Sequence, residues 1–335
     1  MTDFSARPGA RTLGILLASA VAVRVALLFV LPPLVDVYYY DAQAVASLAS
    51  GVDPYGHLYA GIPAWLATQG AQNVYAYLPG VLLFLAPFGP FLDVRVGLIV
   101  ADLAVAVALS ALRGKWSKTA SLAFFLAPWA FLFSTSYPNN TLVAMAFLGG
   151  FLVAETRGRG YLGALSLGAS LASSQFVWLI YPFTLLRYYR ERKLAQAALS
   201  LLVAALIVLP FALWNFGAFV YDTVTFQFAR SVQPLVTPEA LGFNFNPTLS
   251  GLVATATGLS VPLALRAALA AAALVLLLAR TKDLPGLLRN ASVFLLLAIF
   301  LLPDDFSWWY LELPFQTFLS WLAVGRAGDE THANA

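Results

Sequence analysis

Long apolar runs alternate with short polar segments along the whole chain. Several runs approach or exceed the roughly 18 residues that a helix needs to cross a bilayer. The first run, about 13–35, follows Arg7 and Arg11. It is too long for the apolar part of a cleavable signal peptide, so we interpret it as an uncleaved first span. The pattern predicts an all-α, polytopic transmembrane helical bundle.

The basic residues arrange these runs into pairs. Most of the 19 Lys and Arg residues fall in short clusters, and such clusters mark cytoplasmic loops. If every cluster is cytoplasmic, an even number of spans separates neighbouring clusters, which predicts about ten spans with both termini cytoplasmic. The clusters are Arg7/Arg11, Arg113/Lys115/Lys118, Arg157/Arg159, Arg187/Arg190/Arg192/Lys193, Arg280/Lys282/Arg289 and Arg326. The spans are expected at 13–35, 77–112, 119–134, 141–155, 161–173, 175–187, 194–216, 262–280, 287–303 and 309–325.

The segment 77–112 would break this pairing if it held two spans. The bend Pro87-Phe88-Gly89-Pro90 suggests instead one long helix broken by proline, with its first half oblique or re-entrant. Two long segments, about 36–76 and 217–261, then lie on the outer face of a single transmembrane domain, 1–335. Their aromatic content argues against disorder, so we expect these segments to carry the function.

Composition agrees with a membrane location and narrows the chemistry. Hydrophobic residues make up 61% of the chain and charged residues 10%, and the mean hydropathy is +0.80. Soluble domains carry about 25% charged residues. The net charge of +3 fits anchoring beside membrane lipids, and no basic patch alternates with aromatics as nucleic-acid binding requires. The absence of cysteine excludes thiolate catalysis, and the two histidines argue against a histidine metal site. We expect no metal and no other cofactor.

Two carboxylates follow the first span. Asp36 lies at its outer mouth, where desolvation strengthens a carboxylate as a proton acceptor, and Asp41 follows in the same segment. In one interpretation, Asp36 is a catalytic base. In the other, Asp36 and Asp41 cap the N-terminus of an amphipathic helix over Ala42–Ser50. The residue types alone leave both interpretations open.

The second outer segment contains one basic residue, Arg230. A second, Arg266, lies at the mouth of the span that follows. Arg230 is flanked by aromatic residues and runs against the positive-inside trend. A guanidinium can grasp a phosphate with two parallel hydrogen bonds, so we expect Arg230 to bind a phosphate, with Arg266 as the second choice. The alternative is a structural ion pair of Arg230 with Asp222 or Glu239.

Few charged residues fall inside the predicted spans. Arg24 lies in mid-span, and Asp102 is the nearest partner by type, so we expect a structural ion pair between them. Glu312 lies about one turn into the last span and joins the candidate site. Trp308 and Trp309 fit an interfacial aromatic belt.

Several short motifs occupy the two outer segments and the last loop. They are Asp36, Tyr38–Tyr40 with Ala42, Gly51-Val52-Asp53-Pro54-Tyr55, Tyr77-Leu78-Pro79, Asn246-Pro247-Thr248-Leu249 and Ser307-Trp308. These positions resemble the GT-C superfamily, the integral-membrane glycosyltransferases that use polyprenyl-phosphate sugars, and most resemble the polyprenol-phosphate-mannose-dependent mannosyltransferases. The chain departs from that pattern where Pro79 lacks a second proline, at Ser136-Tyr137-Pro138 in place of a Gln, and at Gln175 in place of a basic residue.

The resemblance implies an inverting transfer of a mannose-like hexose from a polyprenyl-phosphate donor to a lipid, glycan or protein acceptor. Asp36 would be the general base, with Asp41 as a supporting carboxylate. Arg230 or Arg266 would stabilise the departing lipid phosphate. The remaining substrate-binding candidates are Tyr38, Tyr39, Tyr55 and Tyr77, whose rings would stack on sugar, together with Asn246 and Glu312.

Two other functions fit the same residues. A transporter or flippase of a lipid-linked sugar would also use an outer arginine and a polar cavity. Transporters place charges deep within several spans, whereas only Arg24 and Asp102 are clearly intramembrane here, which favours the enzyme. A non-catalytic relative that binds the lipid carrier within a larger complex is compatible with the departures at Pro79 and Gln175.

Overall fold

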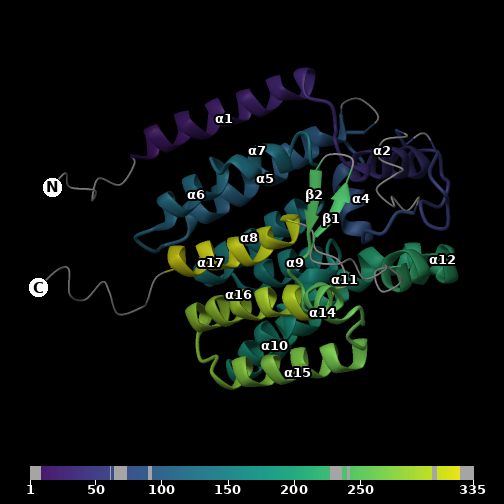
Figure 1. The fold of residues 1–335 in the computed structure, drawn as a ribbon. Coiled ribbons are helices and arrows are strands. Elements are labelled where there is room, and N and C mark those ends of the chain that lie inside the picture. Colours follow the sequence, from purple (N-terminus) through teal and green to yellow (C-terminus); the bar gives the residue numbers. More distant parts are fainter. Residues whose placement is uncertain are drawn as a thin grey trace, which may run out of the picture.

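The computed structural model describes residues 9–60, 62–63, 74–89, 93–226, 236–239, 242–303 and 308–324. These residues form fifteen α-helices, and the longer ones lie side by side in one bundle (Figure 1). The predicted all-α class is confirmed. A two-stranded antiparallel ribbon, β1 (Val236–Glu239) with β2 (Gly242–Phe245), was not predicted.

Among the residues that the structure describes, four helices are long and apolar enough to cross a membrane by themselves. They are α1 (Ala10–Val30), α5 (Val94–Ala111), α11 (Leu194–Trp214) and α16 (Leu284–Leu301). Three shorter apolar helices are α8 (Thr141–Thr156), α9 (Gly160–Leu171) and α15 (Leu263–Ala279). Their hydrophobic residues need a dry environment, and many side chains of α11 and α15 are exposed on the bundle, as lipid contact requires.

The other helices are short or connect the long ones. They are α2 (Asp36–Ala49), α4 (Pro79–Leu85), α6 (Ser117–Phe125), α7 (Pro128–Phe133), α10 (Tyr181–Arg190), α12 (Phe216–Val220), α14 (Leu249–Thr257) and α17 (Glu312–Val324). Two 3₁₀ segments (Gln175–Leu179 and Trp308–Leu311) precede α10 and α17, and one π-helix (Tyr221–Thr225) continues α12. Proline opens α4 and α7 within the first turn, where its missing N–H costs no hydrogen bond.

The segment 77–112 consists of two helices rather than one broken helix. The first, α4, ends at Leu85 in a turn, and α5 starts anew behind Asp93, whose side chain accepts a hydrogen bond from the Arg95 backbone N–H. At about 1.5 Å per residue, α4 is only about 10 Å long, too short to cross a bilayer. The segment therefore supplies one helix of crossing length, as the pairing of spans required.

The basic clusters that fall within the described residues gather at one end of the bundle, which we call the basic end. The Gly114 N–H donates to the Ala323 carbonyl at 2.6 Å, which joins the end of α5 to the end of α17. Arg187 pairs with Glu155 at 2.8 Å, and Arg190 donates to the Thr281 carbonyl, which join the ends of α8, α10 and α15. Figure 1 shows the first turn of α1 and the last turn of α17 at the same end. This arrangement agrees with the predicted pairing, and the membrane side that the basic end faces stays a prediction.

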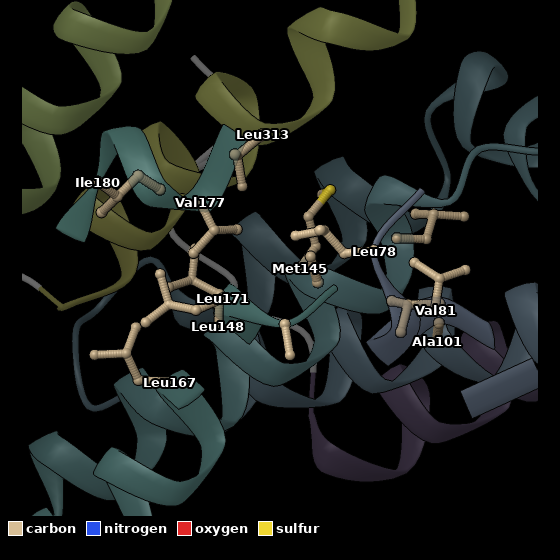
Figure 2. Close-up of a cluster of buried hydrophobic side chains, with 14 of the residues drawn as sticks. Leu78, Val81, Ala101, Met145, Leu148, Leu167, Leu171, Val177, Ile180 and Leu313 are labelled. Carbon is tan, nitrogen blue, oxygen red and sulfur yellow. The ribbon is translucent and has the colours of Figure 1, made fainter. Parts of the chain in front are cut away.

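The core forms around α8, which packs against α5, α9 and α17. Figure 2 shows Met145 and Leu148 of α8 among Leu167, Leu171 and Leu313, all of them buried. Small residues allow the close approach: a Cβ on Gly149 would lie 2.7 Å from the Cβ of Ala108 in α5. This tight packing holds both ends of α8 in place, including the polar turn before it.

Candidate active site

The helix α2 directs one carboxylate into the protein. Its buried residues follow helical spacing: Val37, Tyr40, Asp41, Ala44 and Val45. The helix starts at Asp36 rather than at Ala42, so Asp41 lies in its second turn, and the interpretation of Asp41 as an N-terminal cap is wrong. Asp36 is half-buried in the first turn, where the helix dipole favours a negative charge.

A buried network connects α2 to α17 through the turn before α8. Asn140 Nδ2 donates to Asp41 Oδ1 at 2.8 Å, and Asn139 Nδ2 donates to Glu312 Oε2 at 2.6 Å. All four side chains are buried. We call these residues, Asp41, Asn139, Asn140 and Glu312, the carboxylate network. Within the described part of the chain, Asp41 Oδ2 and Glu312 Oε1 have no hydrogen-bond partner.

Burial disfavours the ionised form of Asp41. Desolvation is the largest influence and raises the pKa of Asp41 well above its usual range; the hydrogen bond from Asn140 lowers it, and the charge of Asp36 raises it. Burial, together with the nearby Asp41 charge, also raises the pKa of Tyr75. The two carboxyl groups of α2 therefore influence each other, and Asp41 holds its proton more strongly than an exposed aspartate does.

The predicted tyrosines occupy two kinds of position. Tyr55 is buried, donates to the Tyr77 carbonyl at 2.8 Å, and meets the rings of Phe219 and Tyr75 edge-on at centroid distances of 5.0 and 5.7 Å. Tyr38, Tyr39 and Tyr77 are half-buried. The structure thus gives Tyr55 a packing role and leaves the other three rings partly accessible.

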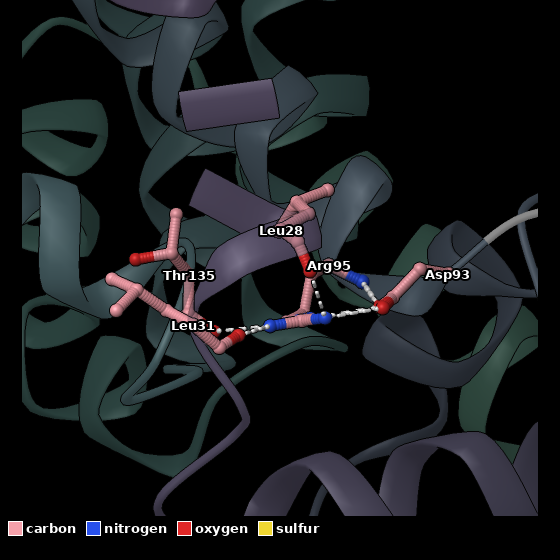
Figure 3. A network of polar contacts seen from close by, with 5 residues as sticks. All are labelled: Leu28, Leu31, Asp93, Arg95 and Thr135. Carbon is pink, nitrogen blue, oxygen red and sulfur yellow. Dashed lines mark hydrogen bonds and ion pairs between the residues drawn. The ribbon is translucent and has the colours of Figure 1, made fainter. Parts of the chain in front are cut away.

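Arg95 forms a second polar network beside α2. Figure 3 shows its guanidinium between Asp93 and backbone carbonyls: Nη1 donates to Leu31 at 3.0 Å and to Thr135 at 3.4 Å, and Nη2 donates to Leu28 at 3.2 Å. Nε and Nη2 also pair with the Asp93 carboxylate, at 3.0 and 2.7 Å. The Tyr38 ring lies 5.2 Å from the guanidinium carbon. Every nitrogen of this side chain is engaged, so the network fastens the end of α1 to the start of α5.

The predicted ion pair of Arg24 with Asp102 is confirmed. Arg24 Nη2 lies 2.9 Å from Asp102 Oδ2, and both side chains are fully buried. The guanidinium also donates to the Phe125 carbonyl at 2.6 Å and to Ser134 Oγ at 3.2 Å, and it lies 3.9 Å from the centre of the Phe125 ring. Saturation of the cation by these groups supports the structural role expected from its mid-span position.

The predicted phosphate-binding arginines and the substrate-binding candidate Asn246 belong to the second half of the chain. Arg266 is buried in α15, and its Nη1 donates to the Leu302 carbonyl at the end of α16, at 2.5 Å. Asn246 is buried in the turn before α14 and accepts from the Thr248 N–H at 3.3 Å. Arg230 lies outside the described residues, as does any pair that it forms with Asp222.

The two outer segments are joined by Asp222 of the π-helix. Asp222 Oδ2 accepts from the Gly56 N–H at 2.8 Å. Gly56 has φ +78°, and a Cβ there would lie 2.6 Å from the Cβ of Ala218, so both the conformation and the close approach require glycine. Gln175 Nε2 strengthens the junction by donating to the carbonyls of Ala76 and Thr223, at 3.0 and 3.1 Å.

Asn139 and Asn140 were not predicted as site residues. The available signal was their position: two adjacent amides in the outer turn before a long apolar helix, where a polar group is buried only with a partner. Among the described residues, no group of three or more His, Asp or Glu side chains is arranged to hold a metal ion. We call the end of the bundle that carries the carboxylate network the site end. Carboxylates, amides and aromatic rings define it.

These features define an all-α membrane bundle with buried carboxylates at the end opposite the basic end. No family model and no curated protein matches the chain. The fold is similar to the crystal structure of ArnT from Cupriavidus metallidurans bound to undecaprenyl phosphate, with a TM-score of 0.58 and 13% sequence identity. The match covers 97% of this chain and 62% of the ArnT chain, so this chain spans less than two thirds of the length of ArnT. The ArnT-like fold and the four candidate spans indicate an integral membrane protein.

Proposed function

We propose that this chain is a GT-C glycosyltransferase that moves a sugar from a polyprenyl-phosphate donor to a lipid, glycan or protein acceptor. The observation that carries the proposal is the likeness to ArnT, a protein with this fold that binds undecaprenyl phosphate, over 97% of the chain. The GT-C motifs around Asp36 and Gly51–Tyr55 support the same class independently of the fold. A mannose-like hexose is the sugar that the motifs favour.

In the proposed reaction, Asp36 accepts the proton of an acceptor hydroxyl group. The hydroxyl oxygen forms a bond to the anomeric carbon while the bond from that carbon to the phosphate oxygen breaks, which inverts the anomeric configuration. The phosphate leaves with the electron pair of the broken bond, and Arg230 or Arg266 stabilises its charge. Half-burial of Asp36 and its position in the first turn of α2 suit a base that substrate can reach.

The membrane arrangement belongs to the same proposal. Ten spans result if α6 and α7 cross as one broken element, and if α8, α9, α10, α15 and α17 cross with the four longer helices. The basic end then faces the cytoplasm, and the carboxylate network faces the other side. Asp36 lies on that non-cytoplasmic face, where we place the transfer.

A turnover assay tests the proposal. Purified protein is supplied with a panel of polyprenyl-phosphate sugars and lipid or glycan acceptors, and release of polyprenyl phosphate is measured. We expect transfer by the wild type and a loss of about 100-fold or more in Asp36→Asn, which keeps the shape of the side chain but cannot accept the proton. Wild-type activity in folded Asp36→Asn would refute the assigned base.

The same preparation distinguishes the flippase and the non-catalytic carrier-binding protein. Reconstitution into vesicles with a labelled lipid-linked sugar shows whether the lipid crosses the bilayer. Movement of the lipid without any change of sugar carrier would identify a flippase, and binding of the carrier with neither movement nor transfer would identify a non-catalytic relative. The enzyme proposal predicts a change of carrier.

A further inference from the structure

The turn before α8 forms a hydrogen bond to each of two carboxyl groups, and each bond uses only one of the two carboxyl oxygens. Asn140 donates to Asp41 of α2, and Asn139 donates to Glu312 of α17, so adjacent residues reach two helices that are far apart in the sequence. Asp41 Oδ2, Glu312 Oε1 and Asn140 Oδ1 have no hydrogen-bond partner in the part of the chain that the structure describes. Buried polar atoms normally have partners, so this concentration needs an explanation.

Hydrogen bonds of the backbone fix the turn that carries the two amides, and one more bond orients the amide of Asn139. Asn139 Oδ1 accepts from the Thr141 N–H at 3.0 Å, which orients the amide group and leaves its Nδ2 for Glu312. The Asn139 N–H donates to the Phe133 carbonyl at 3.0 Å, and the Asn139 and Asn140 carbonyls accept from Leu142 and Val143 at the start of α8. The turn that leads into α8 therefore positions both carboxyl groups.

An amide is suited to this task because it donates a hydrogen bond without adding charge. A Lys or Arg would form an ion pair with the carboxylate, as Arg95 does with Asp93 at 2.7 Å, and an adjacent cation favours the charged form of a carboxyl group. A carboxylate would instead repel its partner. An amide orients a carboxyl group in either protonation state and leaves the second oxygen uncommitted.

We propose that Asn139 and Asn140 are positioning residues that keep Asp41 Oδ2 and Glu312 Oε1 available to hydroxyl groups of the sugar or the acceptor. This inference rests on the proposed glycosyl transfer. Neither asparagine contacts the reacting atoms in the scheme; each acts through the carboxyl group that it orients.

The test is the pH profile of Asn140→Asp. This isosteric change replaces the amide N–H by a carboxylate oxygen, so the contact with Asp41 survives only when one carboxyl group is protonated. Three other titratable groups interact electrostatically with Asp41: Asp36 on α2, and Tyr59 and Tyr75 from the first outer segment. All three are unchanged in the variant. We expect transfer at pH 7.5 to fall at least about tenfold and the optimum to move toward acid by about one pH unit.

Two further variants separate positioning from a loss of structure. Asn140→Ala removes the donor without adding charge, so its activity should fall at every pH without a shift of the optimum. Asn215→Asp is the matched control: Asn215 is exposed at the site end and caps α12 through its Oδ1, which aspartate retains. Its profile should follow the wild type. An Asn140→Asp profile equal to that of the wild type overturns the positioning role while the proposed function stands.

A stability measurement keeps the inference testable without turnover. The unfolding midpoint of Asn140→Asp in detergent should fall more steeply between pH 5 and pH 8 than that of the wild type or Asn215→Asp, because two adjacent carboxylates repel once both are ionised. Parallel slopes would overturn the coupling of residue 140 to Asp41. A wild type without transfer would refute the proposed function, and the slopes would still decide whether this coupling exists.

Discussion

Two polar networks lie beside α2, and they differ in how completely their atoms are paired. Around Arg95, each guanidinium nitrogen donates to a carboxylate or to a backbone carbonyl. In the carboxylate network, Asp41 and Glu312 each use one oxygen only, among the residues that the structure describes. Both networks involve the same stretch before α8, since Thr135 contacts Arg95 and Asn140 contacts Asp41.

If the proposed function holds, the difference separates buried polar groups that hold the fold from those available for chemistry. A saturated cation that bridges helix ends has nothing left to offer a substrate. A buried carboxyl group with an unused oxygen costs stability, and proteins retain such groups where function requires them. The first network should therefore respond to mutation through stability, and the second through turnover.

The largest effect on stability is expected from Arg95→Met. The change removes the ion pair with Asp93 and leaves the carbonyls of Leu28 and Leu31 without this donor, which should lower the free energy of unfolding by at least about 2 kcal/mol. Transfer per folded molecule should stay within about twofold of the wild type. Denaturant unfolding in detergent gives the first quantity. Arg113→Met, at an exposed position of the basic end, is the control and should change neither.

Asp41→Asn should show the opposite response. Transfer should fall at least about tenfold because the supporting carboxyl group is lost, while the Asn140 hydrogen bond can persist. The raised pKa of Asp41 means that its contribution to stability is complete below the unfolded pKa of about 3.9 and is lost as pH rises through the folded pKa. The variant lacks this loss, so its unfolding midpoint should fall less with pH. Midpoints measured from pH 4 to pH 9 with equal slopes in both proteins would contradict the assignment.

The smallest effect is expected where neither network is touched. Gly56→Ala forces an L residue into φ +78° and against Ala218, and should cost about 1–2 kcal/mol. Gly51→Ala has a similar φ of +70° but open space around the new methyl group, so it should cost about 1 kcal/mol at most. The difference between the free energies of unfolding of the two variants measures the contribution of the close contact between Gly56 and Ala218, which joins the two outer segments. Equal costs would show that the approach to Ala218 does not matter.

Hydropathy and charge were enough to predict the membrane-crossing class and the gathering of basic clusters, because both depend on the solvent that each residue meets. The pair of Arg24 with Asp102 was predictable since a mid-span cation needs a partner and few candidates exist. The sequence did not predict that α2 starts at Asp36. Three consecutive tyrosines, Tyr38–Tyr40, do not show which side of a helix is apolar, and only the packing of the folded protein buries Tyr40.

The partners within the site could not be predicted. Asn140 and Asp41 are 99 residues apart in the sequence, and nothing local indicates that they meet. Tyr55 belongs to a motif that suggested sugar stacking, but a sequence does not distinguish a ring that faces a ligand from one enclosed by Phe219 and Tyr75. The roles of Asp36 and Arg230 stay predictions, and Arg230 lies outside the described residues.

One measurement tests the division between chemical and structural residues most directly: sugar transfer from a polyprenyl-phosphate donor, normalised to folded protein, for the wild type, Asp36→Asn and Arg95→Met. We predict activity in the wild type and in Arg95→Met, and background release of polyprenyl phosphate in Asp36→Asn. Full activity in Asp36→Asn, or loss of activity in folded Arg95→Met alone, would contradict the assignment of Asp36 to the chemistry and of Arg95 to the fold.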